Sequence, residues 1–242
     1  MAELQVLANR AVSSGLPVLL IDTCSVLDIV RCSMRMKPAD VQAALDLVAA
    51  TNFDPPRCYL IRSSLVEREF ENHIYSTKKE LENELNDLTA RIGCLDVAAE
   101  YFGVARMGVQ PAPELSGCLE RLAREIITKC EPIDPHVDAQ ARAHQRVVSA
   151  TAPARPSKQS YKDCVIFEEY LELANRYQIG SRNQAVAFVT SNTDDYRREG
   201  KTHPDIESAA EAAGLRICFS WQHARYVLLG PPSSVRTPSH YG

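Results

Sequence analysis

Four acidic residues, far apart in the chain, stand where a predicted strand ends or within a predicted helix. Asp22 follows the apolar run PVLLI, Glu69 lies about two turns into a helix, Asp163 is in the first turn of another helix, and Asp195 follows VAFVT. Carboxylates held close together cannot all be ionised without a counter-charge. A hard divalent cation supplies that charge, because Mg²⁺ and Mn²⁺ prefer oxygen ligands. The residue types therefore suggest a metal site able to activate water.

The elements that must position these acids alternate between strands and helices. Strands are predicted, from apolar runs bounded by polar residues, at 17–22, 57–63, 184–192 and 215–221. Helices are predicted, from apolar residues three or four apart, at 25–33, 38–50, 64–92, 116–130, 134–150, 161–178 and 205–213. This alternation predicts an α/β fold with a mostly parallel sheet covered on both faces. Ligands of such sheets bind at the carboxyl ends of the strands.

The composition sets the outer limits. The chain has 242 residues, of which 45% are hydrophobic, enough for one large domain or two small ones. The net charge of -4 argues against nucleic acid wrapping around most of the protein surface, but it permits a local basic patch. We find neither a membrane span nor a signal peptide, and we expect a cytoplasmic protein. Eight scattered cysteines indicate reduced thiols rather than disulfides or a zinc site.

The segments around the four acids resemble the PIN domain nucleases. In chain order they read IDTCSVL, SLVEREFENH, KDCVIFEEYLELA and TSNTDDY, and the resemblance extends over about residues 17–220. It implies a three-layer PIN-like fold in a single domain at 1–230, with a helical insertion at about 74–160. It also implies a metal-dependent endoribonuclease that hydrolyses RNA, with DNA not excluded. The composition of 231–242 predicts a disordered tail.

The resemblance also assigns roles to the acids. All four would be catalytic. Asp22, Asp163 and Asp195 would bind Mg²⁺ or Mn²⁺, and Glu69 would bind the metal or orient the attacking water. Asp194 is the alternative to Asp195.

Three neighbouring polar residues would assist these acids. Thr23 and Ser191 would hold metal-bound water or a phosphate, or serve as caps at the strand ends. Asn192 stands where the family often has an acid, which disfavours a second metal ion.

A polyanionic substrate requires basic residues beside the acidic pocket. Three clusters qualify, and any member can equally be a solvated surface residue: Arg31, Arg35 and Lys37; Arg155, Lys158 and Lys162; Arg197, Arg198 and Lys201. Aromatic residues make up 7% of the chain, and nothing in it resembles an aromatic platform for RNA bases. We expect Phe219 and Trp221 to be core residues, and His73 to be an ordinary surface histidine.

Each acid also has a structural interpretation. Asp22 can cap a helix, and Asp163 in a first turn suits the helix dipole. Asp194 and Asp195 can form a polar turn. Glu67 is the alternative to Glu69. Helical residues two apart do not share a face, so the two glutamates cannot both face the site.

Two other functions stay open. One is a catalytically weak or inactive PIN-like module that binds RNA or a protein partner. The other is a phosphatase with Asp22 as its nucleophile, which Cys24 opposes because such enzymes place a second Asp there. For the nuclease, a homo-oligomer or an inhibitory protein partner is left open.

Overall fold

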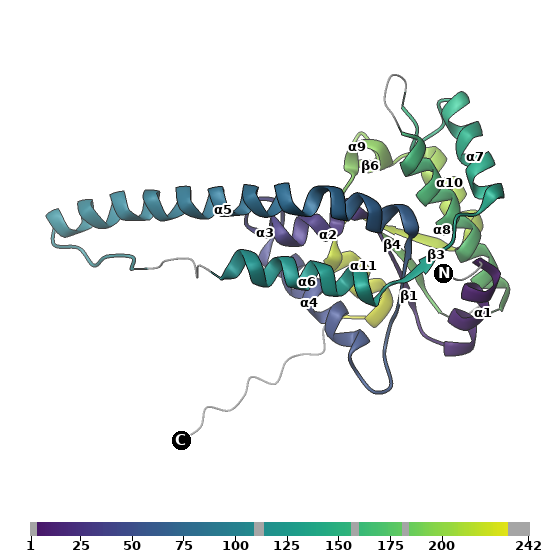
Figure 1. Cartoon of the computed structure of the whole chain (residues 1–242), viewed down its shortest axis with the longest axis horizontal. Helices are drawn as coiled ribbons and strands as arrows, with labels where there is room; N and C mark the ends of the chain where they lie inside the picture. The colour runs from purple at the N-terminus through teal and green to yellow at the C-terminus, as the bar shows by residue number, and fades with distance from the viewer. Residues whose placement is uncertain (1–3, 109–113, 156–159, 181–183, 232–242) are drawn as a thin grey trace.

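A five-stranded, all-parallel sheet forms the centre of the protein (Figure 1). The structure is a computed structural model and describes residues 4–108, 114–155, 160–180 and 184–231. In the order in which they lie side by side, the strands are β3 (Glu131–Ile133), β2 (Tyr59–Ser63), β1 (Val18–Ile21), β4 (Val186–Val189) and β7 (Leu215–Cys218). The predicted α/β class with a parallel sheet is confirmed.

The two central strands explain why the sheet forms here. Every residue of β1 and β4 is buried, as expected for parallel strands covered on both faces. Leu20 of β1 pairs with Phe188 of β4 on one side and with Ile61 of β2 on the other. Because all the strands run in the same direction, the residues that follow β1, β2 and β4 meet at one edge.

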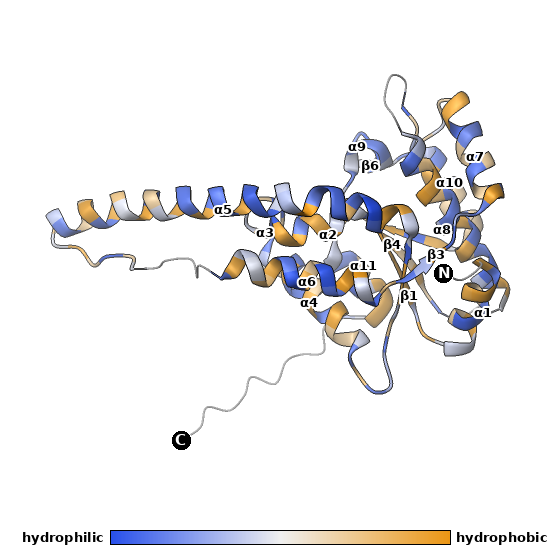
Figure 2. Ribbon diagram, in the orientation of Figure 1, coloured by the Kyte–Doolittle hydropathy of each residue, from blue (hydrophilic) through white to orange (hydrophobic). Residues whose placement is uncertain are grey.

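Helices cover both faces of the sheet. One side carries α1 (Leu4–Ser14), α7 (Val137–Val148), α8 (Tyr161–Gly180) and α10 (Pro204–Ala213). The other side carries α2 (Thr23–Val30), α3 (Cys32–Arg35), α4 (Pro38–Thr51), α6 (Leu115–Lys129) and α11 (Trp221–Leu229). Figure 2 shows apolar residues in the strands and mixed faces on the helices. Among the described residues, no helix is both long and apolar enough to cross a bilayer.

Helix α5 (Ser64–Tyr101) is a single 38-residue helix, about 57 Å long at 1.5 Å per residue. Ser63 caps it by accepting a hydrogen bond from Leu65 N at 3.2 Å. Its buried residues end at Leu81, and its carboxyl half projects from the body (Figure 1). The sequence predicted a helix at 64–92, and the structure extends it to Tyr101.

The region predicted as a helical insertion, about 74–160, is not entirely helical. It contains β3, the edge strand beside β2, which the sequence analysis missed. This strand has three residues, one of them Pro132, and so offers no periodic pattern. Helices α1 and α11 were also not predicted. Gly214 is the C-cap of α10, with a φ of 69°.

Two further predictions concern the tail and the cysteines. Residues 232–242 of the predicted tail lie outside the described residues. All eight cysteines are free thiols, and four of them are buried: Cys58, Cys130, Cys164 and Cys218.

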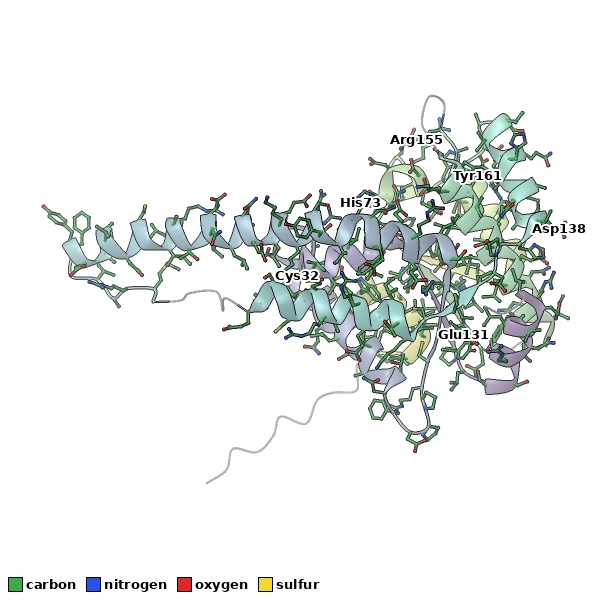
Figure 3. The ribbon with its side chains drawn as sticks, viewed as in Figure 1. Cys32, His73, Glu131, Asp138, Arg155 and Tyr161 are labelled. Atoms are coloured by element: carbon green, nitrogen blue, oxygen red, sulfur yellow. The ribbon has the colours of Figure 1, made fainter. Side chains whose placement is uncertain are left out.

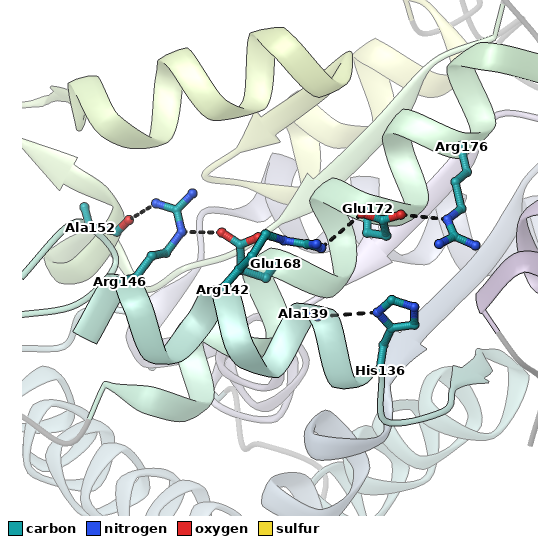
Figure 4. Close-up of polar contacts among 8 residues, drawn as sticks. All are labelled: His136, Ala139, Arg142, Arg146, Ala152, Glu168, Glu172 and Arg176. Carbon is teal, nitrogen blue, oxygen red and sulfur yellow. Dashed lines mark hydrogen bonds and ion pairs between the residues drawn. The ribbon is translucent and has the colours of Figure 1, made fainter. Parts of the chain in front are cut away.

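An ion-pair network fixes α7 against α8 (Figure 4). Glu168 on α8 is 5% exposed and pairs with two arginines of α7, Arg142 and Arg146. Glu172, one turn along α8, pairs with Arg142 at 3.0 Å and with Arg176 at 2.8 Å. A buried carboxylate is tolerated here because its charge is compensated by direct partners.

Candidate active site

Asp22 lies directly after β1, at the carboxyl edge of the sheet. It occupies the N-cap position of α2, with φ -104° and ψ 150°, but its side chain makes no capping hydrogen bond. Instead its Oδ2 accepts hydrogen bonds from Thr190 Oγ1 at 2.6 Å and from Cys24 Sγ at 2.9 Å. Since Thr190 follows the neighbouring strand β4, two strand ends hold this carboxylate in place.

The electrostatic environment of Asp22 is unfavourable for its charge. The side chain is 5% exposed. Burial raises the pKa of Asp22, the hydrogen bonds from Cys24 and Thr190 lower it, and the charge of Glu69 raises it. Within the described ranges, no arginine, lysine or histidine forms an ion pair with Asp22. A bound cation would supply the missing charge.

Glu69 is tied to the same edge by Thr23, the first residue of α2. Thr23 Oγ1 donates a hydrogen bond to Glu69 Oε2 at 2.9 Å, and it also lies 3.4 Å from the carbonyl oxygen of Val66. Glu67, by contrast, points to Arg62, whose Nη2 lies 2.7 Å from its Oε2. The structure therefore places Glu69, and not Glu67, beside Asp22.

Asp163 lies half-buried in the first turn of α8. Its carbonyl oxygen accepts a hydrogen bond of 3.4 Å from the hydroxyl of Tyr196, which is 1% exposed. Burial raises the pKa of Tyr196, and the charges of Asp22 and Asp163 raise it further. The Tyr196 hydroxyl therefore links Asp163 to α9, the helix that also carries Asp195.

Asp195 lies in α9 (Thr193–Tyr196) and is 3% exposed. Asn192 Nδ2 donates a hydrogen bond to Asp195 Oδ2 at 2.8 Å, and Arg155 Nε lies 3.1 Å from Asp195 Oδ1. Asp194 is exposed, and its carbonyl oxygen accepts a hydrogen bond from Arg155. Asp195 is therefore the inward-facing member of the pair, and Asn192 positions it.

Two residues of this edge were given no role in the sequence analysis. Thr190 is fully buried, holds Asp22, and accepts a hydrogen bond from Asn192 N at 3.1 Å. Tyr196 packs edge-on against Phe167 and Phe188 beneath the acids. Both belong to the segment TSNTDDY, so the motif contained the signal. Ser191, which was predicted to hold metal-bound water or a phosphate or to cap the strand end, is half-buried.

The oxygen donors of this edge are of the kind that Mg²⁺ and Mn²⁺ prefer. The chemistry of the set, with a buried Asp22 that lacks an ion-pair partner among the described residues, fits a cation. However, in the part of the chain that the structure describes, no three His, Cys, Asp or Glu side chains form a group that could hold a metal ion. The acids line one edge without converging on one point, partly because Arg155 and Asn192 engage Asp195.

The basic residues predicted to bind substrate fall into three situations. Arg31 is engaged by Asp28 at 3.1 Å and by Glu80 at 3.5 Å. Lys158 lies outside the described residues. The other predicted members are exposed: Arg35, Lys37, Arg155, Lys162, Arg197, Arg198 and Lys201.

The remaining predictions concern three aromatic or histidine side chains. His73 is exposed, as expected (Figure 3). Trp221 is 3% exposed and donates from Nε1 to Ser25 O at 3.2 Å, which confirms it as a core residue. Phe219 is only half-buried, and the guanidinium carbon of Arg197 lies 4.9 Å from its ring centroid.

Comparison with known proteins points to one family. Neither the curated proteins nor the solved structures give a significant match. A family model described as the PIN domain matches residues 19–196, a span that contains all four acids and more than half of the chain. PIN domains are generally nucleases. The chain therefore belongs to the PIN domain family.

Proposed function

We propose that this protein is a metal-dependent endoribonuclease that hydrolyses RNA phosphodiester bonds, with DNA as a second substrate to be tested. The observation that carries the proposal is the buried carboxylate of Asp22. It lies beside Glu69 at the carboxyl edge of the sheet, and no cationic side chain of the described chain pairs with it. A protein retains such a destabilising charge where function requires it.

The chain's own residues would prepare the site in three ways. Asp22, Asp163 and Asp195 would hold Mg²⁺ or Mn²⁺, which would acidify bound water and stabilise the leaving oxygen. Thr190 orients Asp22 through its hydrogen bond of 2.6 Å. Thr23 orients Glu69, whose half-buried carboxylate would accept a hydrogen bond from the attacking water.

Two matched pairs of variants test the proposal. RNA is incubated with the wild-type protein and Mg²⁺ or Mn²⁺, and the ends of the products are sequenced. We expect 3′-hydroxyl and 5′-phosphate ends. Glu69→Gln should lose cleavage while Glu67→Gln, on the same helix, keeps it. Asp195→Asn should likewise lose cleavage while Asp194→Asn keeps it. Identical cleavage by wild type, Glu69→Gln and Asp195→Asn would overturn the proposal.

One observation supports the alternative of a catalytically weak or inactive module. Asp195 is held by Arg155 and Asn192, and the described acids do not form a three-ligand metal group. Mn²⁺ binding measured by electron paramagnetic resonance separates the two functions. Stoichiometric Mn²⁺ binding that is lost in Asp22→Asn supports the enzyme. RNA binding without Mn²⁺ binding or cleavage supports the module.

A further inference from the structure

A hairpin next to the acidic edge carries three cations around an open pocket. Strands β5 (Arg197–Arg198) and β6 (Lys201–Thr202) follow α9, so Arg197 stands two residues after Asp195. Together with Phe219, which follows β7, the hairpin lines a pocket of about 700 Å³. The hairpin and Phe219 both extend from strand-end segments at the carboxyl side of the sheet. The pocket therefore lies on the same side of the molecule as the proposed active site.

The cationic side chains of the hairpin destabilise the pairing of its two strands. Arg198 and Lys201 are directly opposite each other in the antiparallel pair, where like charges are destabilising. The pocket is lined by three cationic side chains, those of Arg197, Arg198 and Lys201. Two carboxylates, those of Glu199 and Glu207, also line it, which leaves a net charge of one positive unit. An anion bound between Arg198 and Lys201 would relieve their repulsion.

The turn of the hairpin is strained as well. Glu199 has φ 53° and Gly200 has φ 80°, so both central residues have positive φ. This turn favours glycine, asparagine or aspartate, and a glutamate in it is unusual. Non-glycine residues in this region cluster at sites that clamp ligands. The turn brings Arg198 and Lys201 opposite each other at its two ends.

A flat cationic surface completes the pocket. Arg197 covers the ring of Phe219, with the guanidinium carbon 4.9 Å from the centroid, and its Nη2 donates to Gly200 O. These two contacts hold the guanidinium plane in a defined position. Nucleic acid bases that are not paired stack on arginine planes and aromatic rings.

We infer that this pocket binds one unpaired nucleotide of a single-stranded substrate, with its base on Arg197 and its phosphate between Arg198 and Lys201. The inference rests on the proposed function for its substrate class. It predicts a preference for single strands over duplexes, because a base in a duplex has no free face for stacking on Arg197. It also gives Phe219 a role that the sequence analysis did not assign.

The test measures binding separately from cleavage. Fluorescence anisotropy is recorded with a fluorescein-labelled 12-nucleotide single-stranded RNA, in the Asp22→Asn background and without added metal. The oligonucleotide is synthesised with one abasic position, moved along its length. We expect one abasic position to weaken binding about 10-fold, the effect of losing one stacked base. That position should have no further effect in Arg197→Ala or Phe219→Ala.

Two controls separate stacking from charge and from folding. Arg197→Lys keeps the charge but not the plane, so it should lose the abasic effect and keep the salt dependence. The double variant Arg198→Ala with Lys201→Ala should keep the abasic effect, and its plot of log affinity against log salt should be shallower by about 0.7 for one lost phosphate contact. Arg91→Ala, with a side chain 64% exposed on the projecting helix, is the charge-matched control and should bind like the parent.

The outcomes distinguish this inference from the proposed function. If RNA is cleaved but no abasic position matters, or duplex binds as well as single strand, the pocket is not a nucleotide site and the enzyme stands. If the abasic effect is present and depends on Arg197 and Phe219 but no cleavage occurs, the pocket stands and the enzyme fails.

Discussion

Two buried residues with carboxylate side chains, Asp22 and Glu168, are each 5% exposed, but their carboxylates have different kinds of partner. Glu168 is met by Arg142 and Arg146, which compensate its charge. Asp22 receives hydrogen bonds from Thr190 and Cys24 and is repelled by Glu69. The first arrangement joins two helices, whereas the second leaves a charge available to something outside the chain. The presence of arginine partners therefore distinguishes the structural carboxylate of Glu168 from the candidate functional carboxylate of Asp22.

Removing the charge of Asp22 should have the largest effect, and it should fall on activity. We expect Asp22→Asn to reduce RNA cleavage about 1000-fold, because it removes a ligand of the metal that would stabilise the leaving oxygen. The measurement is the initial cleavage rate at saturating Mn²⁺. Glu168→Gln should keep its activity once corrected for the folded fraction. A comparable loss of rate in both variants would erase the distinction between the two carboxylates.

Removing the charge of Glu168 should instead reduce stability. We expect Glu168→Gln to lower the free energy of unfolding by about 3 kcal/mol, because Arg146 is left without its carboxylate partner. Urea unfolding followed by circular dichroism measures the change. Glu172→Gln is the matched control, since Glu172 lies on the same helix and shares Arg142 but is more exposed, and it should cost about 0.5 kcal/mol. Equal effects of the two changes would contradict the assignment of Glu168 as the buried anchor.

Glu169, the neighbour of Glu168, adds a third case. It is 1% exposed, and burial raises its pKa to about 7 from the ordinary value of 4.5. A raised folded-state pKa means that the folded protein binds the proton more tightly than the unfolded chain. Stability should therefore fall as pH rises through the window between the two values. We expect a loss of about 2 kcal/mol between pH 5 and pH 7.5.

The measurement for Glu169 is urea unfolding across that pH range. Glu169→Gln cannot ionise, so its stability should be flatter with pH than that of the wild type. Burial also raises the pKa of Asp22, which adds a slope of the same sign. The Asp22→Asn variant separates the two contributions. An unchanged slope in Glu169→Gln would show that its carboxylate does not titrate in this window.

The smallest expected effect is a gain in stability. Without metal, Asp22→Asn should raise the free energy of unfolding by about 1 kcal/mol, because it removes a buried charge that the protein does not compensate. Thermal unfolding in the presence of a chelator measures it. Added Mn²⁺ should then raise the melting temperature of the wild type but not of Asp22→Asn. A variant less stable than the metal-free wild type would show that Asp22 is structural, like Glu168.

The sequence analysis succeeded where the signal is local. Apolar runs predicted β1, β2, β4 and β7, and steps of three and four residues predicted most of the helices, including α5. It failed for β3, whose three residues are ordered by their neighbour β2 rather than by their own pattern. The same division holds at the site, where the acids were named but Thr190 was not.

From the sequence alone, one can determine that this chain forms an α/β sheet and that four acids follow strand ends or lie on helices beside them. That much depends on periodicity and on the types of neighbouring residues. Which groups neutralise which charges was decided by the tertiary structure. Thr190 and Asp22 are 168 positions apart in the chain, and Arg155 and Asp195 are 40 positions apart. Ion pairing and hydrogen bonding depend on distances of a few ångströms, and only the packed sheet and helices set those distances.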